Sequence, residues 1–267
     1  MPFSHELPYL QFSHPEYDSV LTRLARQLAA AYETGTLLDV GANVGDSAAR
    51  LRAGCDFPIL CVEGDPYYSS FLRSNAERIG GRVVIEEIYV GGEDEIIQAR
   101  GVRVRGTSRL EASGGSSQQI VSLRALLRNH RDLPPLRLVK SDTDGFDWAI
   151  MEGGLPIWQE LHPVLLFECD PVFYPDGWDP RPLLRRLSGA GFRTLLAYEN
   201  DGQFLTALDT RDERAIEALY AFLVARRGRS YLDVCIFHEA DAAIAEAFRS
   251  AEVLRILQRR TNVSPGS

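Results

Sequence analysis

A short glycine-containing segment carries residue types that can bind a charged, nucleotide-like ligand. The stretch LLDVGANVGDSA, residues 37–48, leads from apolar residues through an acidic residue to Gly41 and Gly45, and then into a helix-forming run. Only glycine lets the backbone approach a ligand so closely, so amides of this turn can hold a carboxylate or a phosphate. An apolar run over residues 58–62 then ends in Glu63, about twenty residues beyond the glycines, where a carboxylate can bind a ribose diol. The spacing predicts a pocket for a nucleotide-type ligand.

Two classes of ligand suit this layout: a nicotinamide or flavin dinucleotide, and S-adenosylmethionine. A dinucleotide site uses the spacing Gly-x-Gly-x-x-Gly, so that the pyrophosphate rests on the amino terminus of the helix. Here three residues separate Gly41 from Gly45, and this wider turn resembles the first motif of S-adenosylmethionine-dependent methyltransferases. The alternative, that the glycines only turn the chain between a strand and a helix, is less favoured because the acidic residue follows at the expected distance.

A second group of charged residues lies at the ends of two other strand-like runs. The segments LVKSDTDG and FECD supply Lys140, Asp142, Asp144, Glu168 and Asp170. In an open α/β sheet, ligands bind at the carboxyl ends of the strands, so these side chains should face the pocket of the glycine turn. Four carboxylates there repel one another unless a cation, a proton or a basic substrate lies among them. Such crowding often marks function, although either aspartate of the first segment can instead cap the following helix.

The motifs LLDVGANVGDSA and LVKSDTDGFDWAIMEGG together resemble the FkbM family of S-adenosylmethionine-dependent methyltransferases. Members often carry Lys-Ile-Asp-Val-Glu-Gly, which residues 140–145 follow as Lys-Ser-Asp-Thr-Asp-Gly, and the resemblance covers residues 37–170. Two positions depart from the pattern: Asp144 replaces the usual glutamate, and Arg124 stands where relatives commonly carry aspartate. The shorter Asp144 side chain means that the geometry at the methyl acceptor cannot be copied from the family.

The resemblance implies a function and a set of roles. It implies an O-methyltransferase that acts on a hydroxyl of a small molecule, such as a sugar or a glycosylated or polyketide secondary metabolite, as in antibiotic biosynthesis. We expect the glycine turn to hold the methionine end of S-adenosylmethionine, the acid after it to bind the ribose, and the end of the third strand to contact the adenine. The expected cofactor-binding residues are Asp39, Gly41, Asn43, Gly45, Asp46, Ser47, Glu63, Gly64, Glu87 and Ile88.

The candidate catalytic residues are Lys140, Asp142 and Asp144, and two mechanisms stay open for removing the acceptor proton. In one, a carboxylate or a histidine acts as the general base. In the other, Mg²⁺ bound by Asp142, Glu168 and Asp170 lowers the pKa of the acceptor hydroxyl. The histidines His162 and His238 are favoured as structural or solvated residues, because the sequence places neither ring in the pocket. Lys140 can pair with an acid or attract an anionic acceptor.

The elements that must position these residues alternate as in a doubly wound α/β sheet. Apolar residues at helical spacing predict a lead-in helix over residues 15–32. Seven strand-like runs follow, with helical segments between most of them. They cover residues 36–40, 58–62, 82–90, 136–141, 164–169, 192–198 and 231–238. This arrangement matches the seven-stranded, Rossmann-like sheet of class I methyltransferases that the resemblance implies, whose last strand is antiparallel.

The domain organisation follows from this order: residues 1–35 as an N-terminal helical cap, 36–240 as the methyltransferase domain, and 241–267 as a C-terminal helix with a frayed tail. Thr210 and Glu213 predict a capping box for the helix between the last two strands. Two surface segments can cover the pocket. Residues 91–119 predict a hairpin followed by a loop of small residues, which together act as a lid or only form a surface hairpin without contact to substrate. Residues 171–178 predict an aromatic loop that stacks on the acceptor or packs on the core.

Composition narrows the partners. With 29 basic against 37 acidic residues the net charge is −8, and the absence of a basic run argues against nucleic acid. No apolar stretch approaches membrane-spanning length, so we expect a cytoplasmic protein without a membrane segment. The four cysteines form no Cys-x-x-Cys pair and predict buried free thiols. The terminal helices can bury against a second copy in a homodimer.

Two rival functions are weighed. A nicotinamide-dependent oxidoreductase on a Rossmann sheet predicts a Gly-x-Gly-x-x-Gly turn and a catalytic Tyr/Lys pair, neither of which is found. A non-catalytic protein that only binds S-adenosylmethionine is opposed by the acidic strand ends, and measured turnover would exclude it.

Overall fold

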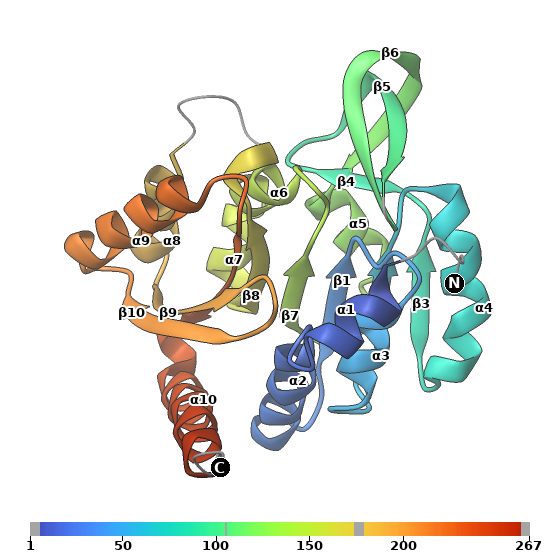
Figure 1. Ribbon diagram of the computed structural model, residues 1–267. Helices are drawn as coiled ribbons and strands as arrows, with labels where there is room; N and C mark the ends of the chain where they lie inside the picture. The colour runs from blue at the N-terminus through green and yellow to red at the C-terminus, as the bar shows by residue number, and fades with distance from the viewer. Residues whose placement is uncertain (1–5, 105, 174–178, 263–267) are drawn as a thin grey trace.

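The computed structural model describes residues 6–104, 106–173 and 179–262 (Figure 1). Its helices are α1 (Leu7–Ser13), α2 (Ser19–Ala31), α3 (Asp46–Arg52), α4 (Pro66–Ile79), α5 (Leu123–Asn129), α6 (Asp147–Gly153), α7 (Leu155–Leu161), α8 (Arg181–Gly189), α9 (Glu213–Arg226) and α10 (Ala242–Asn262), with 3₁₀ helices η1 (Pro171–Phe173) and η2 (Glu239–Asp241). Its strands are β1 (Thr36–Val40), β2 (Ile59–Val62), β3 (Val83–Glu86), β4 (Tyr89–Gly91), β5 (Glu95–Val104), β6 (Thr107–Ser122), β7 (Leu136–Ser141), β8 (Val164–Cys169), β9 (Phe192–Glu199), β10 (Phe204–Asp209) and β11 (Leu232–His238).

The main sheet has the strand order β10-β9-β11-β8-β7-β1-β2-β3. The strands from β8 to β3 run parallel, while β11 is antiparallel to both β8 and β9. The predicted doubly wound sheet with an antiparallel last strand is therefore confirmed. An eighth strand, β10, was not predicted; it pairs with β9 after a tight turn in which Gly202 has a φ of +85°. Positive φ favours glycine, which lets the chain reverse there.

The strand predicted over residues 82–90 is wrong as a single element. The chain forms β3 in the main sheet, leaves its edge, and then forms β4, which pairs with β6 in a separate three-stranded sheet. The continuous apolar pattern hid this break, because both pieces bury part of their residues although they belong to different sheets. The hairpin predicted within residues 91–119 is confirmed as β5 and β6, which rise above the carboxyl ends of the parallel strands (Figure 1). The loop of small residues predicted to follow it is wrong, because β6 continues as a strand to Ser122.

Helices cover both faces of the main sheet and enclose two apolar cores. Helices α2, α3, α4 and α10 bury apolar side chains against one face, and α5 to α9 bury theirs against the other. All residues of β1 and β8 are buried, as expected of parallel strands packed on both sides. The four cysteines are free and buried, as predicted.

The helix boundaries differ from prediction at both ends of the chain. The lead-in helix α2 begins at Ser19, and a separate helix, α1, precedes it. The capping box predicted for α9 is wrong: the side chain of Asp212 caps this helix by accepting hydrogen bonds from the amides of Arg214 and Ala215. The Thr210 hydroxyl instead donates to the carbonyl of Phe192. Among the described residues, none of the helices is long and apolar enough to span a membrane.

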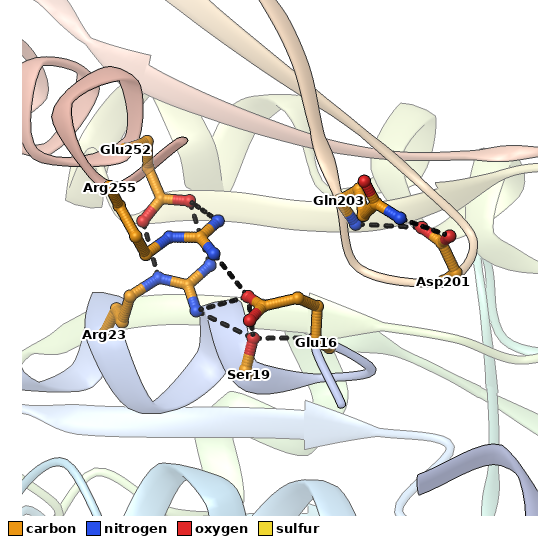
Figure 2. Close-up of polar contacts among 7 residues, drawn as sticks. All are labelled: Glu16, Ser19, Arg23, Asp201, Gln203, Glu252 and Arg255. Atoms are coloured by element: carbon orange, nitrogen blue, oxygen red, sulfur yellow. Dashed lines mark hydrogen bonds and ion pairs between the residues drawn. The ribbon is translucent and has the colours of Figure 1, made fainter. Parts of the chain in front are cut away.

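A cluster of buried charges ties α10 to α2 and to the segment before it (Figure 2). The carboxylate of Glu252 is 1% exposed and accepts two hydrogen bonds from Arg23, at 2.5 and 2.9 Å. Arg255 donates to Glu252 at 3.2 Å and to Glu16 at 2.5 Å. Ser19, the first residue of α2, donates to the carbonyl of Glu16 at 2.6 Å. Two acids and two arginines therefore hold the N-terminal segment against the C-terminal helix.

We expect Glu252→Gln to lower the free energy of unfolding by about 2 kcal/mol, because the amide leaves two guanidinium groups without their shared carboxylate. Urea denaturation would measure this change. Glu246→Gln is the matched control, since Glu246 pairs with Arg249 on the exposed side of the same helix and its loss should leave the midpoint unchanged. Equal midpoints for the two variants would show that the cluster does not stabilise the fold.

Candidate functional site

A cavity of about 1040 Å³, open space included, lies at the carboxyl ends of β1, β2 and β7. The turn after β1, the end of β2, residues 88–90, the tip of the β5–β6 hairpin, the loop after β7 and the N-terminal segment all line it. The expected cofactor residues that line it are Gly41, Asn43, Asp46, Ser47, Glu63, Gly64 and Ile88, together with the three catalytic candidates Lys140, Asp142 and Asp144. The two sequence motifs therefore do meet in one pocket.

The glycine turn is held by backbone contacts that exclude any side chain. Gly41 has a φ of +75°, and a Cβ atom built on it would lie 1.8 Å from the carbonyl oxygen of Asp142. The amides of Gly41 and Ala42 both donate to the carbonyl of Val62, at 2.9 and 3.0 Å. Gly45 has a φ of +91° and does not line the pocket; its part is to end the turn where α3 begins. The turn is thus clamped between β2 and the loop after β7.

A buried ion pair supports the turn from below. Asp39 is fully buried, and its carboxylate lies 3.2 Å from the ammonium of Lys140 and accepts a 2.6 Å hydrogen bond from Ser47. Lys140 also donates to the carbonyl of Gly41 at 3.1 Å and lies 3.6 Å from Asp142. Burial alone would lower the pKa of Lys140, but the nearby carboxylates of Asp39 and Asp142 outweigh it and raise that pKa well above its usual value. Asp39 itself does not line the pocket.

Glu63 reaches the turn from the end of β2. Its two oxygens accept backbone hydrogen bonds from Asn43 and Asp65, both at 2.8 Å, and its side chain is 7% exposed. Burial raises the pKa of Glu63 to about 7, against the opposing effect of these two amides. A carboxylate has about four lone-pair positions, so two remain to accept hydrogen bonds from a ligand.

The residues after β3 divide between the pocket and the surface. Ile88 lines the pocket, but Glu87 does not; its carboxylate accepts a hydrogen bond from Ser69 and pairs with Arg73. Tyr89 lines the pocket too, and its ring lies so close to Gly64 that a Cβ atom there would be 2.2 Å away. The sequence analysis did not identify Tyr89 as a pocket residue, because Tyr89 lies within the single strand predicted over residues 82–90.

The tip of the β5–β6 hairpin folds over the pocket. Arg103 donates two hydrogen bonds to Asp65, at 2.6 and 2.5 Å, and Asn43 donates from its side chain to the carbonyl of Gly106 at 2.8 Å. Thr107 and Ser108 then line the cavity. The hairpin was predicted, but its contacts with the glycine turn were not, since they join residues about sixty positions apart.

The loop after β7 presents two acids with different surroundings. Asp147 is 1% exposed and accepts hydrogen bonds from the Ser141 hydroxyl, at 2.6 Å, and from the Thr143 amide, at 3.1 Å, so it holds the loop in shape. Asp144 has a φ of +51° and lines the pocket. Burial, followed by the charge of Asp142, raises the pKa of Asp144 to about 7. Asp144 is therefore poised to exchange a proton near neutral pH.

The predicted Mg²⁺ site is not supported. Within the described ranges, no group of three His, Cys, Asp or Glu side chains is arranged to hold a metal ion. Asp170 turns back to accept a hydrogen bond from the Val172 amide at 2.8 Å. Glu168 does not line the pocket, and burial and the neighbouring carboxylates, Asp142 first, raise its pKa well above the usual value. Asp142 alone of the three lines the pocket.

An unexpected contribution comes from the N-terminal segment. Tyr17 and Asp18, which precede α2, line the pocket. Asp18 has a φ of +55°, unusual for a residue other than glycine, and burial together with the charge of Asp46 raises its pKa to about 7. The sequence indicated this contribution only through the predicted N-terminal helical cap. In the structure, the residues just before α2 line the pocket.

The two histidines lie away from this pocket. Their rings stack with centroids 3.7 Å apart, His162 just before β8 and His238 at the end of antiparallel β11. Both positions belong to the edge of the sheet opposite the carboxyl ends of the parallel strands. This placement agrees with the prediction that His162 and His238 are structural or solvated residues and not the general base. Of the aromatic loop predicted over residues 171–178, residues 174–178 lie outside the described part of the chain.

Residues 39–194 match the family model described as methyltransferase FkbM domain. This span includes the glycine turn, Glu63 and the whole loop after β7. No curated protein matches the chain.

Among solved structures, the chain is similar to a methyltransferase FkbM from Methylobacillus flagellatus KT, with 16% identity over 51% of this chain and 33% of that one, and a TM-score of 0.36. The chain thus spans a third of that protein. It is also similar to an O-methyltransferase from Bacillus cereus solved in complex with SAH (14% identity, 82% and 80% coverage, TM-score 0.41). A third is the O-methyltransferase TomG from Streptomyces achromogenes, involved in tomaymycin synthesis (15%, 83% and 79%, 0.42). These likenesses are too distant to carry an argument about ligand or reaction, so the family match carries the assignment.

We expect Gly41→Ala to lower the free energy of unfolding by more than about 2 kcal/mol, because the new methyl group meets the Asp142 carbonyl and the backbone is in a conformation that alanine resists. Gly189→Ala is the control, since no atom outside its helix lies within 4 Å of a Cβ there and its φ is not positive. Thermal and urea unfolding would compare them. A Gly41→Ala protein as stable as the control would contradict the clamped turn.

Proposed function

Because the chain belongs to the methyltransferase FkbM family, we propose that it transfers the methyl group of S-adenosylmethionine to a hydroxyl of a small molecule, either a sugar or a glycosylated or polyketide metabolite. The observation that supports this most strongly is the meeting of two chemistries in one cavity. The glycine turn and Glu63 line this cavity, and so do the acids Asp142 and Asp144. A donor bound at the glycine turn and Glu63 would present its methyl group to an acceptor held by these acids.

The residues of the pocket fit S-adenosylmethionine. Glu63 keeps two lone-pair positions for ribose hydroxyls, and the apolar side chains of Val62 and Ile88 offer a surface for the adenine ring. Asp46, in the first turn of α3, lines the cavity where the amino group of the methionine end would lie. When bound, the donor supplies an electrophilic methyl carbon attached to a sulfonium.

The chain must then align the acceptor and take its proton. Asp144 is the best candidate for the general base. With a pKa of about 7 it is partly ionised at neutral pH, and the ionised carboxylate can accept the acceptor's proton. Asp142 is half exposed, lies 3.6 Å from Lys140, and can orient the acceptor by accepting a hydrogen bond from it. Lys140 fixes Asp142 and the Gly41 carbonyl in place, and so acts as a positioning residue.

The rival functions are less favoured by the same features. A dinucleotide oxidoreductase needs room for a pyrophosphate at the amino end of α3, whereas Gly41 and Asn43 pack the turn tightly against the loop after β7 and the hairpin tip. A protein that only binds the donor would have no use for Asp144, a half-buried acid with a near-neutral pKa that lines the pocket. A homodimer through the terminal helices remains part of the proposal, as does a cytoplasmic location.

We expect Glu63→Gln to raise the dissociation constant of adenosylhomocysteine at least tenfold, about 1.4 kcal/mol, because the amide replaces a carboxylate oxygen that would accept a ribose hydrogen bond. Calorimetric titration would measure it. Glu77→Gln, which neutralises an exposed glutamate of α4, should bind like the parent protein. Unchanged affinity in a folded Glu63→Gln protein would remove this residue from donor binding.

We expect turnover to rise with pH below about 7 and to level off above it, because the base must lose its proton before it can accept one from the acceptor. Release of adenosylhomocysteine, with an acceptor found in a panel of glycosylated metabolites, would give the profile. Asp144→Asn should lower kcat at least about 100-fold and leave adenosylhomocysteine affinity unchanged. Asp144→Glu should keep activity with a displaced pH limb, whereas a limb that stays in place would point to Glu63, whose pKa is also about 7.

A further inference from the structure

A second, smaller cavity adjoins the first pocket beside the loop after β7 and the segment before α2. It encloses about 410 Å³, open space included. It shares Tyr17, Asp18, Lys140 and Asp142 with the first pocket, so only these side chains separate the two spaces. A molecule in the second cavity would therefore lie next to the catalytic candidates.

The floor of this cavity is a row of side chains across three strands. Lys140 on β7 is the register partner of Leu166 on β8, and both line the cavity. Glu168 lies two residues beyond Leu166 and so projects from the same face of the sheet. On β11, Asp233 is directly opposite Glu168 and also lines the cavity. Glu168 does not itself line the cavity, but the register places it beside Asp233 in this row of side chains.

These two acids have no polar partner in the part of the chain that the structure describes. Glu168 is 5% exposed, and neither its carboxyl group nor that of Asp233 makes a hydrogen bond or an ion pair there. Burial, and next the charge of Asp142, raises the pKa of both groups well above the usual value. A buried carboxyl group without a partner costs free energy unless a ligand supplies the missing hydrogen bonds.

The positive charge available in the cavity is already committed. Lys140 is the one basic side chain among the described residues that line it. Its ammonium already contacts Asp39, Asp142 and the Gly41 carbonyl, and although its charge also acts on Asp233, burial and the neighbouring acids still raise the pKa of that group. The positive charge of S-adenosylmethionine would not neutralise these two acids either, because neither Glu168 nor Asp233 lines the first pocket.

We propose that the second cavity binds the methyl acceptor and that this acceptor carries a protonated amine beside its hydroxyl, with the ammonium held by Asp233 and Glu168. An ammonium donates up to three hydrogen bonds, enough for two carboxylates. The rings of Tyr17 and Tyr231 line the same cavity and offer faces to a sugar ring or to the cation. This inference rests on the proposed methyltransferase function and narrows its acceptor to amino alcohols such as aminosugars.

The test uses the full chain saturated with adenosylhomocysteine and titrated by calorimetry with D-glucosamine, N-acetyl-D-glucosamine and D-glucose. We expect glucosamine to bind at least about tenfold more tightly than either neutral sugar. Asp233→Asn should reduce that preference to less than about threefold. Glu168→Gln is the second variant and should act in the same direction. Both amides mimic a protonated carboxyl group, so both proteins should fold.

Asp56→Asn is the matched control, because Asp56 is fully exposed and far from the cavity in a surface turn before β2; its glucosamine preference should be unchanged. Equal affinities for the three sugars, or no binding of any, would overturn the inference. So would an amine preference that survives both floor variants. A failure of the proposed function is seen separately, because it would appear in the first titration as an absence of adenosylhomocysteine binding.

Discussion

The buried pair of Asp39 and Lys140 is the interaction on which the rest of the site depends. The two residues are register partners on neighbouring strands, one fully buried and the other 6% exposed, and their charges lie 3.2 Å apart. Removing one partner of such a pair leaves a buried charge, at a cost of about 3–5 kcal/mol. Through Ser47 and the Gly41 carbonyl, the same pair fixes the turn before α3. The geometry of the donor pocket is therefore set at the centre of the sheet and not in its loops.

A second constraint is the crowding of acids around this one lysine. Besides Asp39, six carboxyl groups from five parts of the chain contribute to this crowding, and several of them have raised pKa values because burial and mutual repulsion disfavour their charges. These are Asp18, Asp46, Asp142, Asp144, Glu168 and Asp233. Burying so many acids together does not stabilise the fold. A ligand that brings positive charge or hydrogen-bond donors would offset the cost of burying them. In the roles proposed above, Asp144 exchanges a proton in the pocket, while Asp233 and Glu168 bind the amine of the acceptor.

The cover of the site comes from two segments outside the main sheet. Two sets of hydrogen bonds hold the tip of the β5–β6 hairpin: Arg103 donates to Asp65, and the Asn43 side chain donates to the Gly106 carbonyl. The hairpin therefore contacts both the N-cap of α4 and the glycine turn. On the other side, the charged cluster around Glu252 holds the segment that carries Tyr17 and Asp18 (Figure 2). The C-terminal helix therefore supports the wall between the two cavities from a distance, through side chains that do not reach either space.

The sequence alone determined the features that depend on local spacing. Alternation of apolar runs and helical segments predicted the sheet, the glycine turn predicted the donor side, and the strand-end acids predicted the second wall. Each of these is encoded within about twenty residues by periodicity or by a glycine requirement. Tertiary structure decided what depends on distant contacts: the break between β3 and β4, the surface position of Glu87, the turning of Asp170 away from a metal site, and the part played by Tyr17. These outcomes follow from which segments pack together, and side-chain burial and charge pairing between residues far apart in the chain leave no periodic signal in either segment alone.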